Sequence, residues 1–185
     1  DIFYLLTNKS RMFTEMEFLE LAKKRFSVRK FEEKPVEEEK IQKIMEAGRV
    51  APTAKDLQPT KVYVIKSEEA LEKLRAITPA TFKAPVVMLV CTDEASAWVN
   101  PFDDFNSHVM DSSIICTHMM MEAEDLGLGT TWVCWFDTAK VKEVFGLPEG
   151  IQPRCLLPVG YPAADVKPGP MHAVRKPAEE IFTVL

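Results

Sequence analysis

The sequence lacks any apolar run as long as a membrane span, and it shows no signal-peptide pattern of charged n-region, apolar h-region and cleavage site. Internal repeats and low-complexity tracts are also missing. We therefore expect no membrane partner. With 185 residues, of which 46% are hydrophobic and 28% are charged, the chain is expected to form one globular domain with a full-sized core.

Paired cysteines and metal-ligand spacings are absent as well. The cysteines stand singly, with no C-x-x-C pair, and the histidines follow no ligand motif. We expect reduced, mostly buried thiols in a cytoplasmic protein and no metal site. These residues are Cys91, Cys116, Cys134 and Cys155, and His108, His118 and His172.

The chain has no strong excess of one charge sign. Its net charge is −5, and acidic and basic residues alternate along residues 31–43. A general nucleic-acid surface is therefore not expected. An anion site would have to be built from a few placed basic residues.

The first residues are set apart from the rest. The chain opens at Asp1 without a methionine, and residues 1–13 are interpreted as an expression-vector remnant or a disordered arm. Residues 14–185 are then expected to form a single domain. Thr14 to Glu17 has the form of a capping box, which predicts a first helix that ends in the basic turn near Arg25.

The remaining pattern predicts a mixture of helices and strands. Two strands are expected to lie in the core, because residues 86–91 are apolar on both faces and residues 154–159 are equally apolar. The predicted elements are a helix from Pro35 to before Pro52, a strand at 61–66, a helix capped by Ser67 to about 75, strands at 86–91 and 131–136, helices at 105–126 and 138–145, a strand at 154–159, and an extended tail after Pro162.

The predicted helix at 105–126 is long and weakly polar. Gly127 is well placed to end it, and the helix should be buried by its neighbours or by a second subunit. The positions expected to form its apolar stripe are Val109, Met110, Ser113, Cys116, Thr117, Met120 and Met121.

A small basic cluster follows the first helix. Arg25 and Arg29 stand four residues apart with Ser27 between them, so in a helix or tight turn the two guanidinium groups share a face. Such a pair can bind phosphate oxygens with charge-assisted hydrogen bonds. Taken alone, the cluster more often marks a solvated basic helix end.

A second segment, residues 51–59, lies between two prolines. Its small residues let the backbone approach a flat ligand, and Asp56 and Gln58 can contact the edge of a heterocycle. Taken alone, it equally fits a helix-to-strand connection in which these two side chains bind the local backbone.

In combination these segments resemble the nitroreductase family. Residues 25–31 are similar to its R-x-S-x-R-x-F pattern, and residues 51–59 to A-P-S-x-x-N-x-Q-P. Further similarities follow in the family's order from Met16 onward. They are L-G-L-G-T at 126–130, F-G-L-P at 145–148, G-Y-P at 160–162 and R-K-P-A-E-E-I at 175–181.

The resemblance implies an α+β fold with a central, mainly antiparallel sheet flanked by helices and an extended C-terminal tail. It also implies FMN as cofactor, a homodimer with FMN at the interface, and transfer of electrons from NAD(P)H to a nitroaromatic, quinone or enone by a ping-pong mechanism. No side chain need act as a nucleophile. The alternative is an FMN-binding carrier or sensor without efficient turnover.

The resemblance assigns roles to twelve residues. The residues expected to bind the cofactor phosphate and ribityl chain are Arg25, Ser27, Arg29 and Arg175. Those expected to pack on the flavin ring are Pro52, Thr53 and Ala54, and those expected to meet its polar rim are Asp56 and Gln58. The residues expected beside its reactive centre are Trp132, Val133 and Cys134. Arg29 also matches a position that can lie near the pyrimidine edge of the flavin.

Three of these residues depart from the family pattern, of which Thr53 in place of Ser is a mild change. Asp56 stands where the family usually has Asn, which replaces an amide donor by a carboxylate that only accepts hydrogen bonds. Cys134 stands where relatives often have Gly. The irregular segment 98–105, with Phe102, Asp103 and Asp104, is interpreted either as a surface loop or as a lid.

Overall fold

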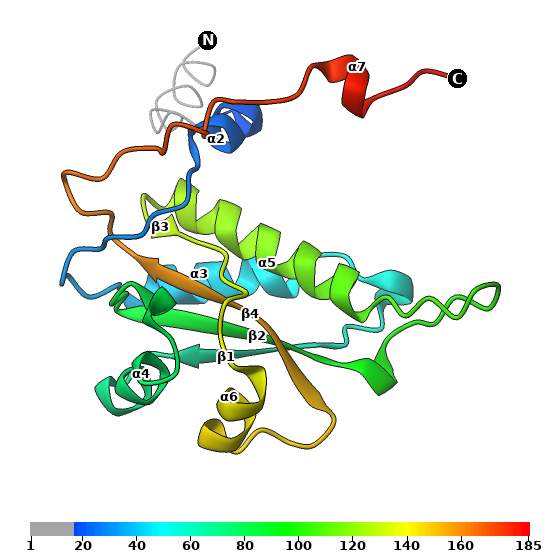
Figure 1. The fold of residues 1–185 in the computed structure, drawn as a ribbon, viewed down its shortest axis with the longest axis horizontal. Coiled ribbons are helices and arrows are strands. Elements are labelled where there is room, and N and C mark those ends of the chain that lie inside the picture. Colours follow the sequence, from blue (N-terminus) through cyan, green and yellow to red (C-terminus); the bar gives the residue numbers. More distant parts are fainter. Residues whose placement is uncertain (1–16) are drawn as a thin grey trace, which may run out of the picture.

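The computed structural model describes residues 17–185, so the residues set apart above and Thr14 to Met16 of the predicted capping box lie outside the described range. The elements in chain order are α2 (Phe18–Lys24), α3 (Glu38–Arg49), β1 (Thr60–Ile65), α4 (Glu68–Arg75), β2 (Val86–Asp93), α5 (His108–Asp125), β3 (Gly129–Thr130), α6 (Thr138–Phe145), β4 (Ile151–Gly160) and α7 (Ala178–Ile181) (Figure 1).

The four strands form one sheet in the order β1-β2-β4-β3, and every neighbouring pair is antiparallel. This confirms the α+β class with an antiparallel sheet. β2 lies between β1 and β4, as its apolar pattern predicts. Its side chains alternate between the two faces, because successive residues of a strand point to opposite sides.

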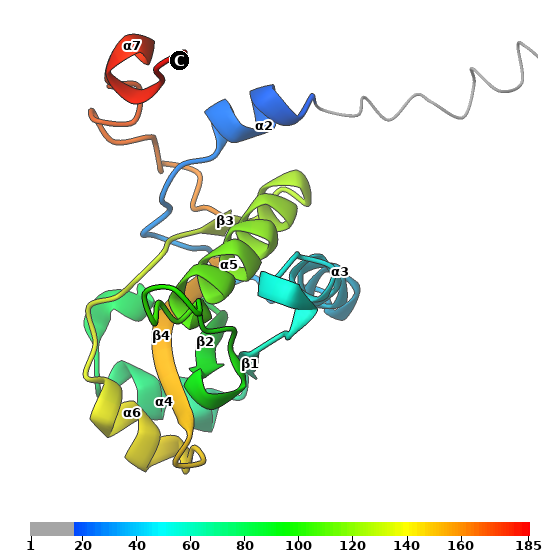
Figure 2. The same cartoon turned by 90° about the vertical axis from the view of Figure 1, so that its right-hand side faces the viewer.

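Helices cover both faces of the sheet (Figures 1 and 2). On one face, Met88 and Val90 of β2 pack in a cluster with α3 and α5. On the other face, Leu89 packs with Leu74 of α4 and Val141 of α6. The sheet therefore divides the core into two apolar layers.

The end signals predicted for α4, α5 and α6 are confirmed, whereas α3 begins at Glu38 and not at Pro35 as predicted. Ser67 caps α4 by accepting a hydrogen bond from the Ala70 N–H at 3.3 Å. Gly146 ends α6 with φ of 58°, and Gly127, just after α5, has φ of 75°. Both glycines adopt the left-handed conformation that other residues rarely take.

The predicted stripe of α5 was wrong in phase. Its buried residues are Asp111, Ser112, Ile115, Cys116, Met119, Ala123 and Glu124, so Cys116 is the one residue that the two sets share. Val109 and Met110 are instead 50% and 53% exposed. The reason is that polar and apolar residues are both spread around α5, so its pattern does not define which face meets the sheet.

The predicted strand at 131–136 is also largely wrong. β3 ends at Thr130, and beyond it only an isolated bridge joins Val133 to Leu156. Gly129 approaches the neighbouring segment closely, because a Cβ atom there would lie 2.5 Å from Cγ2 of Val28. The chain then leaves the sheet edge toward α6, although its residues are typical of a strand.

The tail after Pro162 is extended, as predicted; it runs away from the sheet and carries the short helix α7 (Figure 1). Ile181 and Phe182 are exposed by 57% and 73%. Within residues 17–185, no helix has the length and apolar character needed to cross a membrane.

Candidate functional site

The basic cluster lines a pocket of about 380 Å³. Arg25, Ser27, Arg29 and Arg175 all contribute to its wall, so the structure brings together the four residues predicted to bind the phosphate and ribityl part of the cofactor. The remaining lining residues are Phe26, Gly169, Pro170, Met171 and His172.

An extended backbone, rather than a helix, aligns the cluster. α2 ends at Lys24, and Ser27 forms a parallel bridge with Thr130, while the Val28 N–H donates to the Thr130 carbonyl at 2.9 Å. In an extended segment, every second side chain points to the same face. Arg25, Ser27 and Arg29 therefore share one face, and Val28 is buried on the other.

No lining residue of this pocket is acidic. In the described part of the chain, none of the three arginines forms a salt bridge with a carboxylate. Arg29 donates weakly to the Ser27 carbonyl at 3.5 Å, and Arg175 donates to the Val174 carbonyl at 2.8 Å. The guanidinium groups thus retain donors for an anionic ligand.

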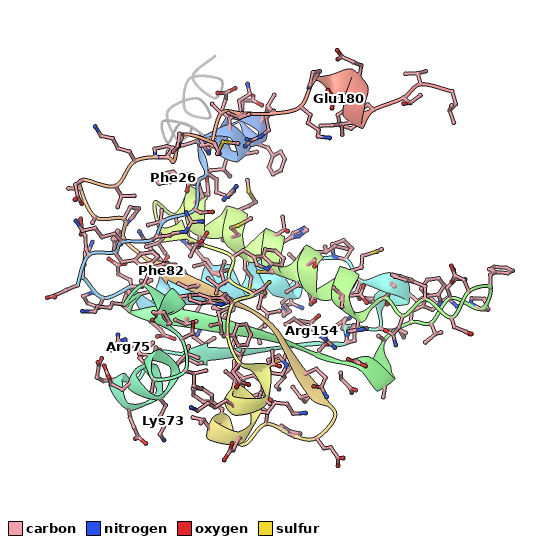
Figure 3. The ribbon with its side chains drawn as sticks, viewed as in Figure 1. Phe26, Lys73, Arg75, Phe82, Arg154 and Glu180 are labelled. Carbon is pink, nitrogen blue, oxygen red and sulfur yellow. The ribbon has the colours of Figure 1, made fainter. Side chains whose placement is uncertain are left out.

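His172 holds the tail against the end of α2. Its Nε2 atom lies 2.9 Å from the Lys23 carbonyl oxygen, and its ring meets the Phe26 ring edge-on with the centroids 6.2 Å apart. Figure 3 shows Phe26 where the segment after α2 passes the tail. These contacts carry Arg175 to the pocket, a role for His172 that the sequence pattern did not reveal.

The second predicted segment forms a tight turn after α3. Lys55, Asp56 and Gln58 have φ of 52°, 54° and 52°, a left-handed conformation that is strained for residues with a side chain. The Gln58 N–H donates to Thr53 Oγ1 at 3.0 Å, and Gln58 Nε2 donates to Asp56 Oδ1 at 2.9 Å. We name residues 52–58 the proline loop.

The two residues predicted to meet a polar rim are therefore bonded to each other. Asp56 and Gln58 are both exposed, as is Pro52, while Thr53 and Ala54 are half-buried. Thr53 and Gln58 also line an apolar pocket of about 230 Å³, which reaches Ile115 and Met119 of α5.

The third predicted segment is close to the basic cluster. Trp132 packs partly against the α3–α5 core layer, Val133 is buried in the other layer, and Cys134 is exposed. The bridge from Ser27 to Thr130 places the start of this segment beside the pocket that the basic cluster lines.

One chain does not bring all twelve residues together. The proline loop is bonded to the start of α5, where the Ala54 N–H donates to Asp111 at 2.8 Å. The basic cluster lies at the other end, where Lys24 pairs with Glu124 at 3.7 Å. Asp111 and Glu124 are separated by about 20 Å along the helix at 1.5 Å per residue.

A groove of about 660 Å³ lies between α2, α3 and α5. Its apolar wall includes Phe18, Leu21, Val50 and Met121. Phe18 and Val50 are exposed, so residues 17–185 leave this face of the chain uncovered. Among residues 17–185, no group of three or more His, Cys, Asp or Glu is placed to hold a metal ion.

The thiols differ sharply in accessibility, and this gives a test for Cys134. Burial raises the pKa of the Cys91 thiol to about 12, and Cys116 and Cys155 are buried with their sulfurs 3.7 Å apart. We expect one thiol per chain, that of Cys134, to react with Ellman's reagent in the native protein, because thiolates are the reactive form. Peptide mapping of the modified protein would identify the residue.

Added FMN should slow that reaction if Cys134 lies beside the cofactor. A Cys134→Ser variant is the control and should show no rapid reaction. An unchanged labelling rate at saturating FMN would contradict the placement of Cys134 next to the flavin.

Known proteins resemble this chain in sequence. The chain matches the model of the nitroreductase family over residues 22–81 and 76–161. A protein from Methanothermobacter thermautotrophicus with the provisional name NADH dehydrogenase/NAD(P)H nitroreductase is 34% identical over 157 residues, which cover 81% of this chain and 80% of that protein.

Solved structures show the same fold. The crystal structure of a nitroreductase family protein from Clostridium difficile 630 has a TM-score of 0.84 and 37% identity, covering 91% of this chain and 98% of that one. A provisionally named nitroreductase from Exiguobacterium sibiricum, solved in complex with FMN, has a TM-score of 0.79 at 20% identity and covers 93% of this chain and 99% of that one. The chain belongs to the nitroreductase family.

Proposed function

We propose that the protein is an FMN-dependent oxidoreductase that passes electrons from NAD(P)H to a small organic acceptor by a ping-pong mechanism. The acceptor classes that we propose are nitroaromatics, quinones and enones. The observation that carries the proposal is the pocket formed by Arg25, Ser27, Arg29 and Arg175, which no acidic residue lines.

The pocket residues suit the phosphate end of FMN. A phosphate group offers several strong acceptor oxygens, and guanidinium groups bind such oxygens with two parallel N–H donors. Three guanidinium groups and one hydroxyl surround the pocket, and two chain segments far apart in sequence supply them. The Exiguobacterium complex supports the fold only; the pocket residues support the cofactor.

When bound, FMN supplies the redox chemistry of the reaction. The protein then binds and orients it. We propose that Arg29 places positive charge near the pyrimidine edge, which favours the negative charge that develops there on reduction. An ionised Asp56 at that edge would disfavour the negative charge on the reduced flavin. A hydrogen bond that its carboxylate accepts from a flavin N–H would offset this repulsion. Its bond to Gln58 fixes the position of the carboxylate.

We further propose a homodimer whose interface contains the cofactor. The proline loop and the basic cluster lie at opposite ends of α5, and a second, antiparallel copy would bring the loop of one chain to the arginines of the other. The groove beside α5 and the exposed Val109 and Met110 leave an apolar surface of the kind that subunit interfaces cover.

We also infer that the protein works in the cytoplasm. All four cysteines are free thiols, which suits a reducing compartment. This inference rests on the cysteines alone.

Purification and rapid mixing test the proposed activity. The protein should purify yellow and release FMN on denaturation. In rapid mixing, NADH or NADPH should bleach the flavin absorbance at least as fast as the enzyme turns over. A carrier or sensor would stay yellow on that time scale. A colourless protein that binds no added FMN would refute the cofactor itself.

A further inference from the structure

A buried carboxylate joins two segments at the start of α5. Asp111 is 1% exposed and lies in the first turn of the helix. Its Oδ1 atom accepts from the Ala54 N–H at 2.8 Å, and its Oδ2 atom accepts from the Ser107 hydroxyl at 2.7 Å. A buried carboxylate is unfavourable unless such donors satisfy it, so Asp111 depends on both bonds.

The first partner is the proline loop. Its other hydrogen bonds, including those that hold the three left-handed residues, are formed within residues 53–58. Among the hydrogen bonds of residues 17–185, the bond from Ala54 to Asp111 is the one that connects this turn to a helix. Asp111 therefore sets where the turn lies relative to α5.

The second partner is the base of a projecting segment between β2 and α5 (Figure 1). The Ser107 N–H donates to the Trp98 carbonyl at 2.9 Å, and Val99 pairs with Asn106, which closes the base of the segment. Phe102 in this segment is 94% exposed. We name residues 98–107 the projection.

We propose that Asp111 is a positioning residue that holds the proline loop and the projection in a common arrangement. Resting on the proposed function, this means that the loop contacting the flavin and the projection carrying Phe102 approach the bound cofactor as one unit. Asp111 itself touches neither cofactor nor substrate in this role.

Hydrogen exchange measured by mass spectrometry on the cofactor-free protein tests the coupling directly. In Asp111→Ala we expect faster amide exchange in two regions, residues 52–58 and 98–107. In Ser107→Ala, which keeps the Ala54 bond, we expect faster exchange in 98–107 alone. In Asp111→Asn both regions should stay close to the wild type, because the amide oxygen still accepts from Ala54 and its NH₂ group can donate to the Ser107 oxygen.

FMN titration supplies the second measurement. Loss of a charge-assisted bond that orders the loop should weaken FMN binding about tenfold or more in Asp111→Ala, with recovery to within about threefold in Asp111→Asn. Val141→Ala, in the core layer on the opposite face of the sheet, is the control for general destabilisation. It should lower the melting temperature. Amide exchange in residues 52–58 and 98–107 should then increase no more than in the rest of the protein.

Should Asp111→Ala not fold, Ala54→Pro removes the N–H donor, with a ring that also fixes φ at residue 54, and should accelerate exchange in residues 55–58. Unchanged exchange in both regions of Asp111→Ala, or equal losses of FMN affinity in Asp111→Ala and Val141→Ala, would overturn the positioning role. A wild-type protein that binds no FMN would refute the proposed function instead, and the exchange experiment would still decide the coupling.

Discussion

Replacing Arg25 and Arg175 together by alanine is expected to yield protein that purifies without colour. Both side chains line the pocket assigned to the phosphate, and each comes from a different part of the chain. A hydrogen bond to a charged group contributes about 1.5–3 kcal/mol, so the double variant should bind FMN about 10² to 10⁴ times more weakly. Fluorescence titration of the cofactor-free protein measures the dissociation constant.

A charge-matched control separates local binding from net charge. Lys73→Ala with Lys140→Ala removes the same number of positive charges from the exposed faces of α4 and α6. That variant should keep its flavin. Stoichiometric FMN in the Arg25 and Arg175 double variant would show that the phosphate binds elsewhere.

Two inactive variants are expected to regain one flavin site when they share a dimer. One chain carries Arg25→Ala with Arg175→Ala, and the other has residues 53–58 replaced by alternating Gly and Ser. If each site takes the arginines of one chain and the proline loop of the other, the mixed dimer contains one intact site. We expect about one FMN per two chains, against almost none in either parent dimer.

Two different affinity tags allow the mixed dimer to be isolated, and its FMN content and bleaching by NAD(P)H are then measured. The control is a dimer in which both chains carry the arginine substitutions and differ only in their affinity tags, and it should stay colourless. If the mixed dimer of the two different variants also stays colourless, the site is built within one chain and the proposed interface is wrong.

The sequence was most informative where short-range chemistry decides the structure. The Ser67 cap, the glycines after α5 and α6, and the continuous apolar pattern of β2 each act within a few residues, and each prediction was confirmed. The alignment of Arg25 with Arg29 was also predicted, although the expected cause was a helix or a tight turn and the observed cause is an extended backbone.

Other features depend on contacts that no local pattern contains. The phase of α5 is set by which residues meet the sheet, and β3 ends at Thr130 although the residues that follow are typical of a strand. Asp111 looked like an ordinary acidic residue in the first turn of a helix, where negative charge is favoured. Its burial and its bond to Ala54, 57 positions away, emerge only from the tertiary structure.

The extended segment from Arg25 to Arg29 has a consequence for how this chain can vary. Because Ser27 and Arg29 line the pocket while Val28 between them is buried, a substitution at one of these positions leaves the others where they are. An insertion or deletion of a single residue would reverse every side chain beyond it, burying a guanidinium group in place of Val28. Over evolutionary time, this short stretch should therefore tolerate changes of residue type far better than changes of length.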